Sequence, residues 1–302
     1  MRRGLGLARR LALALPYGWL LAFFLVPFAI VARLAISQPV LAQPPFVPVF
    51  DWREGFYGFF LRLAEFSPAA FLGVLQDGLY FEALITSLRL AGLSSLLTLC
   101  LAYPLALAVV RAPLHWRSPL VMLAIAPFWT SFLIRIYAWI AILKDEGLLN
   151  HFLMSLGLIA QPIPLFASET AVVIGIVYSY LPFMVLPLVN ALASQDAALA
   201  EAAHDLGATR LAAFWTVTLP LSWPGIRAGL LLVFIPAMGE VVIPDLLGGS
   251  DTLMIGRSLW NDFFANRDWP AASAAAIMLL AVLALPITAY QRAQTASGGG
   301  GA

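Results

Sequence analysis

The chain has 302 residues, of which 62% are hydrophobic and 11% are charged, and its formal net charge is +1. Soluble domains average about 25% charged residues, so the composition excludes an ordinary soluble domain. The basic residues form no cluster of the kind a nucleic-acid interface needs, so we expect no nucleic-acid partner. An all-α integral membrane protein with six transmembrane helices is predicted, with spans at about 16–36, 86–110, 119–143, 170–192, 226–246 and 271–290.

The N-terminus carries four arginines before the first span, namely Arg2, Arg3, Arg9 and Arg10. We expect them to hold this end in the cytoplasm, because loops rich in arginine and lysine stay inside. A signal peptide is disfavoured, since the long apolar block ends in no clean cleavage site. Residues 37–83 are rich in proline and aromatic residues and predict an external loop with short helices, which either caps the bundle or touches a soluble partner.

The later loops alternate between the two faces of the membrane. Arg111 and Arg117 place the end of the second span inside, and the fourth span returns inside, so residues 194–224 form a cytosolic loop. Arg292 predicts an internal C-terminus, which completes a single transmembrane domain over 1–292. The glycine-rich residues 293–302 are predicted to be a flexible tail or linker.

The cytosolic loop has the signals of two helices joined by a turn. Ser194 is predicted to cap the first helix, with Asp196 in its first turn. Gly207 is expected to end that helix in a left-handed conformation. Thr209 is predicted to cap the second helix, and Leu219–Pro220 to end it before the next apolar block.

Seven positions of this loop follow a fixed spacing: Glu201, Ala202, Ala203, Gly207, Val217, Leu219 and Pro220. The spacing resembles the EAA loop of ABC importer permeases. The resemblance implies a coupling helix that docks on a separate ATPase subunit, and Asp205 is assigned to the same surface. An ordinary amphipathic helix between two spans is the alternative.

Two charged residues, Arg135 and Glu240, fall inside predicted spans. A charge at bilayer depth costs at least about 2.5 kcal/mol, so each is expected to face a partner or a water-filled path. Glu240 either pairs with Arg135 or binds a cationic substrate, in which case Asp245 extends the acidic lining. Five aromatic residues are predicted at about the same depth in the membrane as Glu240, namely Trp129, Tyr137, Trp139, Tyr178 and Tyr180. They either attract a cationic substrate or form part of the aromatic belt at the membrane interface.

No enzyme or metal site is predicted. His115, His151 and His204 lie in loops on both faces and cannot form one metal site or catalytic triad. The single lysine, Lys144, is in no P-loop pattern, so any ATP hydrolysis is expected on another chain.

Nearly the whole chain resembles the polyamine importer permeases of the type I, MetI-like family, and in particular the putrescine type. The segments that carry the resemblance are Leu15–Phe28, Pro127–Asn150, Ile174–Leu188, Phe234–Gly249 and Leu259–Ile277. It implies the type I ABC importer permease fold in the bacterial inner membrane, and import of a polyamine, putrescine preferred, by alternating access. The implied partners are a homologous second permease, an ABC ATPase dimer that binds ATP and Mg, and a periplasmic polyamine-binding protein.

Three alternatives remain open from the sequence. The first is a permease for spermidine or another small solute, such as an amino acid. The second is a secondary transporter that works without an ATPase. The third is a membrane anchor or scaffold with no transport role.

Overall fold

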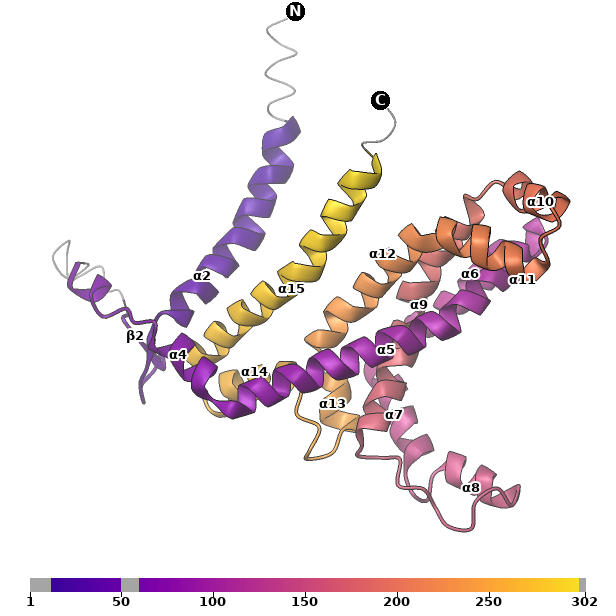
Figure 1. Cartoon of the computed structure of the whole chain (residues 1–302). Coiled ribbons are helices and arrows are strands. Elements are labelled where there is room, and N and C mark those ends of the chain that lie inside the picture. The colour runs from indigo at the N-terminus through magenta and orange to yellow at the C-terminus, as the bar shows by residue number, and fades with distance from the viewer. Residues whose placement is uncertain (1–11, 50–59, 299–302) are drawn as a thin grey trace, which may run out of the picture. The chain divides into compact units, whose positions relative to one another are not determined.

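The computed structural model describes residues 12–49 and 60–298, and the chain folds almost entirely into helices. The four N-terminal arginines and residues 299–302 lie outside the described residues, so the predicted placement of the N-terminus stays a prediction. The chain divides into two compact units, Met1–Phe81 with Ser258–Ala284 and Glu82–Arg257 with Leu285–Ala302. Figure 1 labels the helices and strands, and η marks short 3-10 and π turns.

The first unit holds the beginning of the chain and the segment that leads into the last helix. Its elements are η1 (Leu21–Leu25), α2 (Val26–Ala35), β1 (Gln38–Pro39), β2 (Phe46–Val47), α4 (Ala69–Gln76), η5 (Asn261–Ala265) and the first part of α15 (Trp269–Gly298). The two strands pair antiparallel as a short hairpin. A small core of Ala35, Val74, Ala274 and Ala275 joins α2, α4 and α15. The predicted loop after the first span therefore contains a hairpin and a short helix.

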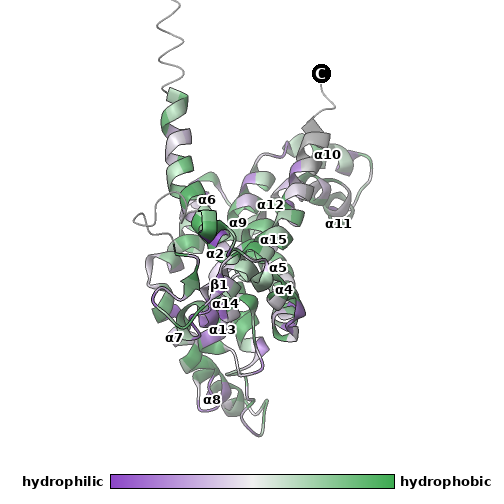
Figure 2. Cartoon of the chain, turned by 90° about the vertical axis from the view of Figure 1, so that its left-hand side faces the viewer, coloured by the Kyte–Doolittle hydropathy of each residue, from purple (hydrophilic) through white to green (hydrophobic). Residues whose placement is uncertain are grey.

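The second unit holds both candidate sites. Its elements are α5 (Gly78–Arg111), α6 (Leu114–Ile125), η3 (Ala126–Trp129), α7 (Phe132–Leu143), α8 (Leu148–Ser155), α9 (Glu169–Ala193), α10 (Ala197–Asp205), α11 (Arg210–Ala213), η4 (Phe214–Thr218), α12 (Leu219–Met238), α13 (Val242–Leu247) and α14 (Ile255–Trp260). Figures 1 and 2 both show α10 and α11 at one end of the α9–α12 pair, and α7, α8 and α13 at the other. The long helices are coloured largely as hydrophobic in Figure 2.

The structure confirms long apolar helices at four of the six predicted spans and corrects the other two. Among the described residues, five helices are long and apolar enough to cross a membrane: Ala12–Ala35, Gly78–Arg111, Glu169–Ala193, Arg210–Met238 and Trp269–Thr288. The predicted third span, 119–143, is instead a pair of helical segments, Leu114–Trp129 and Phe132–Ser155, bent by 87° at the break between them. The count is six if this bent pair is one span.

The predicted fifth span, 226–246, is also interrupted. Its helix ends at Met238, and α13 starts at Val242 after a short break that contains Glu240. Pro244 lies in the first turn of α13, where its missing N–H costs no hydrogen bond, so the sequence favours a new helix start here. At the end of the chain, α15 continues to Gly298, so helix covers much of the segment predicted as a flexible tail.

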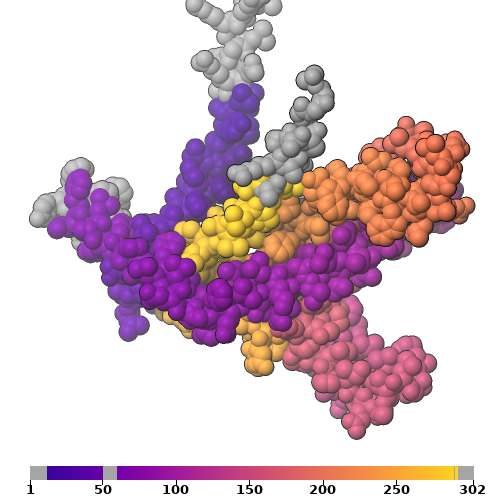
Figure 3. All heavy atoms as spheres, viewed as in Figure 1, coloured from indigo at the N-terminus to yellow at the C-terminus, as the bar shows by residue number. Residues whose placement is uncertain are grey.

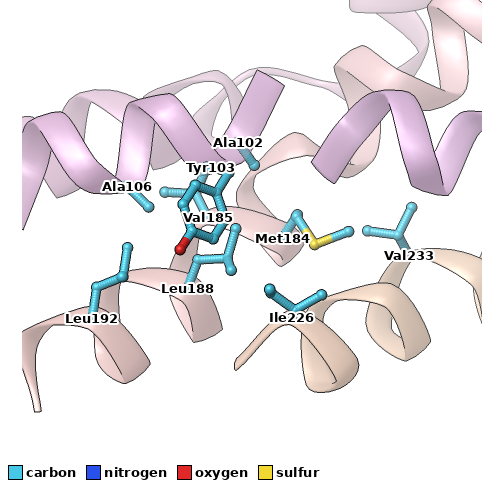
Figure 4. Packing of buried hydrophobic residues seen from close by; sticks show 9 residues of the cluster. All are labelled: Ala102, Tyr103, Ala106, Met184, Val185, Leu188, Leu192, Ile226 and Val233. Carbon is cyan, nitrogen blue, oxygen red and sulfur yellow. The ribbon is translucent and has the colours of Figure 1, made fainter. Parts of the chain in front are cut away.

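Close packing of α12 against α9 holds the second unit together. Gly225 and Gly229 lie four residues apart on α12, the spacing at which small residues let two membrane helices approach. A Cβ added at Gly225 would lie 2.7 Å from the carbonyl oxygen of Pro187 and 2.4 Å from the Cβ of Ala191. Beside this contact, helices α5, α9 and α12 share a buried cluster shown in Figure 4, with Ala102, Tyr103, Ala106, Met184, Val185, Leu188, Leu192, Ile226 and Val233.

We expect Gly225→Ala to destabilise the protein by about 1–3 kcal/mol, because the added methyl group meets backbone that cannot move away. Gly92→Ala is the matched control, since it makes the same change on α5 and a Cβ there meets nothing within 4 Å. Thermal unfolding of the detergent-solubilised chain measures the stability of both variants. A melting temperature for Gly225→Ala as high as that of Gly92→Ala would contradict the close approach of α12 to α9.

Candidate functional site

The predicted cytosolic loop, residues 194–224, folds into an elbow made of α10, the turn at Gly207 and α11. The side chain of Asp196 caps α10 by accepting a hydrogen bond from the N–H of Ala198 at 3.0 Å. The prediction that Ser194 is this cap is wrong, because Ser194 still terminates α9, and its hydroxyl donates to the carbonyl of Ala191 at 3.0 Å. The predicted cap of the second helix is confirmed, since the Thr209 hydroxyl accepts from the N–H of Ala212 at 3.2 Å.

The turn at Gly207 closes α10 as predicted. Gly207 has φ +85°, in the left-handed region that glycine adopts without a steric penalty. Its N–H donates to the carbonyl of His204 at 2.9 Å, and the N–H of Ala208 donates to the carbonyl of Ala203 at 3.0 Å. This pair of bonds is the Schellman motif, which satisfies the last carbonyls of a helix and fixes the direction of the chain that leaves it.

The second arm of the elbow continues straight into the membrane helix. Residues Arg210–Met238 form one helix that passes through the π turn η4 before α12 begins. The prediction that Leu219–Pro220 ends this arm is therefore wrong. Pro220 lies in the first turn of α12, directly after a π turn that already interrupts the regular α-helical bonds, so its missing N–H costs little there.

The elbow exposes some of the residues that the spacing singled out, while Ala203, Val217 and Leu219 are half-buried. Glu201, Ala202 and Asp205 are exposed on α10. Leu206 at the turn is 90% exposed, and Leu211 on α11 is 68% exposed. In the space-filling view, α10 and α11 form an outer tip of their unit (Figure 3). Leu206 and Leu211 therefore add exposed apolar surface beside the acidic groups of α10.

At the other end of α12, the Glu240 carboxylate lies in the break before α13. Its side chain is only 9% exposed. Oε1 accepts hydrogen bonds from the N–H groups of Val242 at 3.1 Å and Ile243 at 3.4 Å, and Oε2 accepts one from the hydroxyl of Tyr180. The carboxylate thereby caps α13, whose positive N-terminal end stabilises a negative charge. Glu240 is therefore held by neutral donors.

Arg135 lies on α7, is also 9% exposed, and does not pair with Glu240. No ion pair within 12–49 and 60–298 involves Arg135, and its Nε and Nη1 atoms have no hydrogen-bond partner there. The guanidinium carbon lies 5.0 Å from the ring centre of Phe128 and 5.6 Å from that of Phe132. The structural pairing that the sequence left open is thus absent, and aromatic faces stabilise the arginine instead.

Three aromatic rings lie in a row between the two buried charges. Tyr180, which donates to Glu240, has its ring centre 5.9 Å from that of Phe183. Phe183 lies edge-to-face with Phe128 at 5.3 Å, and Phe128 lies under Arg135. These phenylalanines were not predicted from the sequence; the contact of Phe128 with Phe183 joins segments that are distant in sequence.

The remaining predicted path residues do not gather at Glu240. Asp245 forms an ion pair with Arg257 at 3.1 Å, and 55% of its side chain is exposed. Tyr178 lies edge-to-face with Trp139 at 5.5 Å. Of the aromatic residues predicted along the path, only Tyr180 forms a hydrogen bond to Glu240. Trp129 is 77% exposed and Tyr137 58% exposed, so their predicted contact with substrate stays a prediction.

We expect Tyr180→Phe to lower the stability of the chain by about 1–3 kcal/mol, because a buried carboxylate loses one of its donors. Tyr178→Phe is the matched control on the same helix, since the ring of Tyr178 lies edge-to-face with Trp139 and its hydroxyl forms no hydrogen bond among the described residues. Denaturation of both variants in the same detergent compares them. Equal stability of the two variants would show that the Tyr180 hydroxyl does not support the Glu240 carboxylate.

Comparisons with known proteins agree with this architecture. The family model described as binding-protein-dependent transport system inner membrane component matches residues 9–296. The spermidine/putrescine transport system permease protein PotB of Haemophilus influenzae is 38% identical over 287 residues, covering 94% of this chain and 93% of the relative. PotB of Escherichia coli is 45% identical over 219 residues, covering 72% of this chain and 80% of the relative.

A solved structure shows the same fold at low sequence identity. It is a bacterial ABC transporter involved in the import of the acidic polysaccharide alginate, with a TM-score of 0.71 and 19% identity over 97% of this chain and 99% of the matched chain. The apolar helices, the elbow with its fixed spacing and the family match all support a membrane permease. The chain belongs to the family of binding-protein-dependent transport system inner membrane components, with the MetI-like fold of ABC importer permeases.

Proposed function

We propose that this chain is a permease subunit of an ATP-driven importer that carries spermidine and putrescine into the cytoplasm. The observation that carries the proposal is the 38% identity to a spermidine/putrescine permease over almost the full length of both chains. The preference for putrescine that the sequence resemblance implies remains a prediction, since the relatives are named for both polyamines.

The Glu240 carboxylate suits a polyamine chemically. A carboxylate has about four acceptor positions, and the N–H groups of Val242 and Ile243 occupy those of Oε1. Tyr180 occupies one position of Oε2, which leaves one for the ammonium group of a substrate. The neighbouring ring of Phe183 adds an aromatic face that attracts cations. Alternating access would open this position first to the periplasm and then to the cytoplasm.

The elbow is the proposed site of coupling to an ATPase. Leu206 and Leu211 expose apolar surface beside Glu201 and Asp205, and the Schellman motif at Gly207 fixes the angle between the two arms. The second arm is continuous with α12, so a displacement of the elbow reaches the break at Glu240 through one helix. The partner ATPase dimer would bind ATP and Mg, while this chain binds neither.

The family membership supports a proposal for the assembly. We propose a homologous second permease and a periplasmic polyamine-binding protein as further partners, in the inner membrane of a bacterium with both termini in the cytoplasm. The proposal of a binding protein is supported by the structure of a bacterial alginate ABC transporter in complex with an alginate pentasaccharide-bound periplasmic protein, which has a TM-score of 0.63 to this chain.

Uptake by proteoliposomes that contain the whole transporter tests the proposal. We expect labelled spermidine and putrescine to accumulate only when ATP, the ATPase and the binding protein are present, with amino acids failing to compete. Uptake driven by an ion gradient without the ATPase would instead show a secondary transporter. The absence of any polyamine uptake, or equal competition by an amino acid, would contradict the substrate assignment.

A further inference from the structure

A cleft of about 710 Å³ lies between the end of α5 and the elbow. Leu107 and Arg111 line it from α5. Ala200 and His204 line it from α10, and Arg210, Leu211, Ala213, Phe214 and Thr218 from the second arm. The lining therefore combines an apolar wall with two arginines and a histidine, and no acidic residue belongs to it.

The two arginines of the cleft have no ion-pair or hydrogen-bond partner in the part of the chain that the structure describes. Within 12–49 and 60–298, neither an ion pair nor a hydrogen bond involves the guanidinium of Arg111 or Arg210. The nearby acids on α10, Glu201 and Asp205, each follow a lining residue by one position. One position is about 100° of rotation around a helix, so these acids belong to the adjacent face of α10. The cleft itself therefore presents net positive charge.

The depth of the cleft in the membrane follows from α5. Arg111 is the last residue of the membrane-spanning helix Gly78–Arg111, and Leu107 is one turn further into it. The 34 residues of α5 make a helix of about 51 Å, longer than a hydrocarbon core of about 30 Å, so the end that carries Arg111 reaches at least the lipid headgroups. Basic pockets between membrane helices at this level bind the headgroups of anionic lipids.

We propose that this cleft is a binding site for an acidic phospholipid. Arg111 and Arg210 hold the phosphate and headgroup, while Leu107 and Phe214 contact the start of an acyl chain. Because α10 and α11 both line the cleft, a bound lipid fastens the elbow to the end of α5. The site is separate from the Glu240 break, so the proposal of a lipid site does not depend on which solute is transported.

Native mass spectrometry of the full chain, first alone and then in the assembled transporter, tests the proposal. The delipidated protein is titrated with phosphatidylglycerol or with phosphatidylethanolamine of the same acyl chains. Each basic residue near an anionic headgroup contributes about fivefold in affinity, so Arg111→Gln with Arg210→Gln is expected to lower phosphatidylglycerol binding roughly 25-fold. Binding of phosphatidylethanolamine should stay unchanged, which shows that the variant is folded.

Arg117→Gln is the matched control, because Arg117 is a nearby arginine outside the cleft whose Nε donates to the carbonyl of Ala112 at 3.1 Å. We expect it to leave selective phosphatidylglycerol binding intact. Equal binding of the two lipids by the unmodified chain, or an equal loss in the control, would overturn the proposal. Displacement of the lipid by an equal concentration of inorganic phosphate would show a free-phosphate site instead. Loss of selective phosphatidylglycerol binding when the permease assembles with the ATPase would show that the ATPase covers the cleft, which would also overturn the proposal.

Discussion

Glu240→Gln is expected to reduce ATP-dependent polyamine uptake roughly 100-fold while leaving the transporter assembled. Removing one partner from a buried ionic contact costs about 2–5 kcal/mol, and a 100-fold loss corresponds to about 2.7 kcal/mol. The glutamine still has an oxygen that can accept the hydrogen bonds from the N–H groups of Val242 and Ile243, so the cap of α13 is retained. Initial rates of labelled spermidine uptake in proteoliposomes measure the effect.

Asp245→Asn is the control for this substitution. The Asp245 carboxylate is already paired with Arg257 and is more than half exposed, so its loss should reduce uptake less than tenfold. Failure of the Glu240→Gln chain to assemble with its partners would show that the carboxylate acts as a structural cap. Uptake at the unmodified rate by an assembled Glu240→Gln transporter would exclude the carboxylate from the substrate path.

Gly207→Val is expected to weaken ATPase binding about tenfold and to abolish most ATP-driven uptake. A left-handed conformation costs a residue with a side chain about 1–2 kcal/mol, and a β-branched residue more, so the turn of the elbow opens. The surface formed by Glu201, Leu206 and Leu211 then loses the arrangement that a partner recognises. Co-purification of the ATPase with the permease, together with uptake, measures the change.

Gly157→Val provides a matched control for backbone strain. Gly157 has φ +70° and, like Gly207, open space where a Cβ would be, but it follows α8 and is far from the elbow in sequence. Its substitution should cost similar strain and leave ATPase binding unchanged. Equal loss of ATPase binding in both variants would mean that general destabilisation, rather than the elbow, explains the effect of Gly207→Val.

Local chemistry explains which parts of the elbow were predictable. Gly207 and Thr209 act through bonds within a few residues of themselves, and both predictions are confirmed. The choice between Ser194 and Asp196 depends on where α9 ends, which tertiary packing decides. Pro220 resembles a stop signal, yet the π turn before it lets the helix continue.

The membrane site was predictable in part for a similar reason. The cost of burying a charge was enough to single out Arg135 and Glu240, and both are in fact 9% exposed. Tyr180 was among the aromatic residues predicted along the path, but its hydrogen bond to Glu240 was not predictable, because these two residues meet only in the folded chain. The contact of Arg135 with Phe128, seven residues earlier in the chain, was not predicted either. The bend in the third span was missed as well, although the polar residues Thr130 and Ser131 mark the break between its two segments.

Cross-linking from the tip of the elbow tests most directly whether a separate ATPase drives this permease. Cys100 is the single native cysteine, so Leu206→Cys in a Cys100→Ser background places one thiol at the 90% exposed turn. A short bifunctional thiol reagent is expected to join this position to the ATPase in the assembled transporter, with labelling from the cytoplasmic side only. Labelling of position 206 from the periplasmic side, or a cross-link to the binding protein in place of the ATPase, would contradict the proposed coupling.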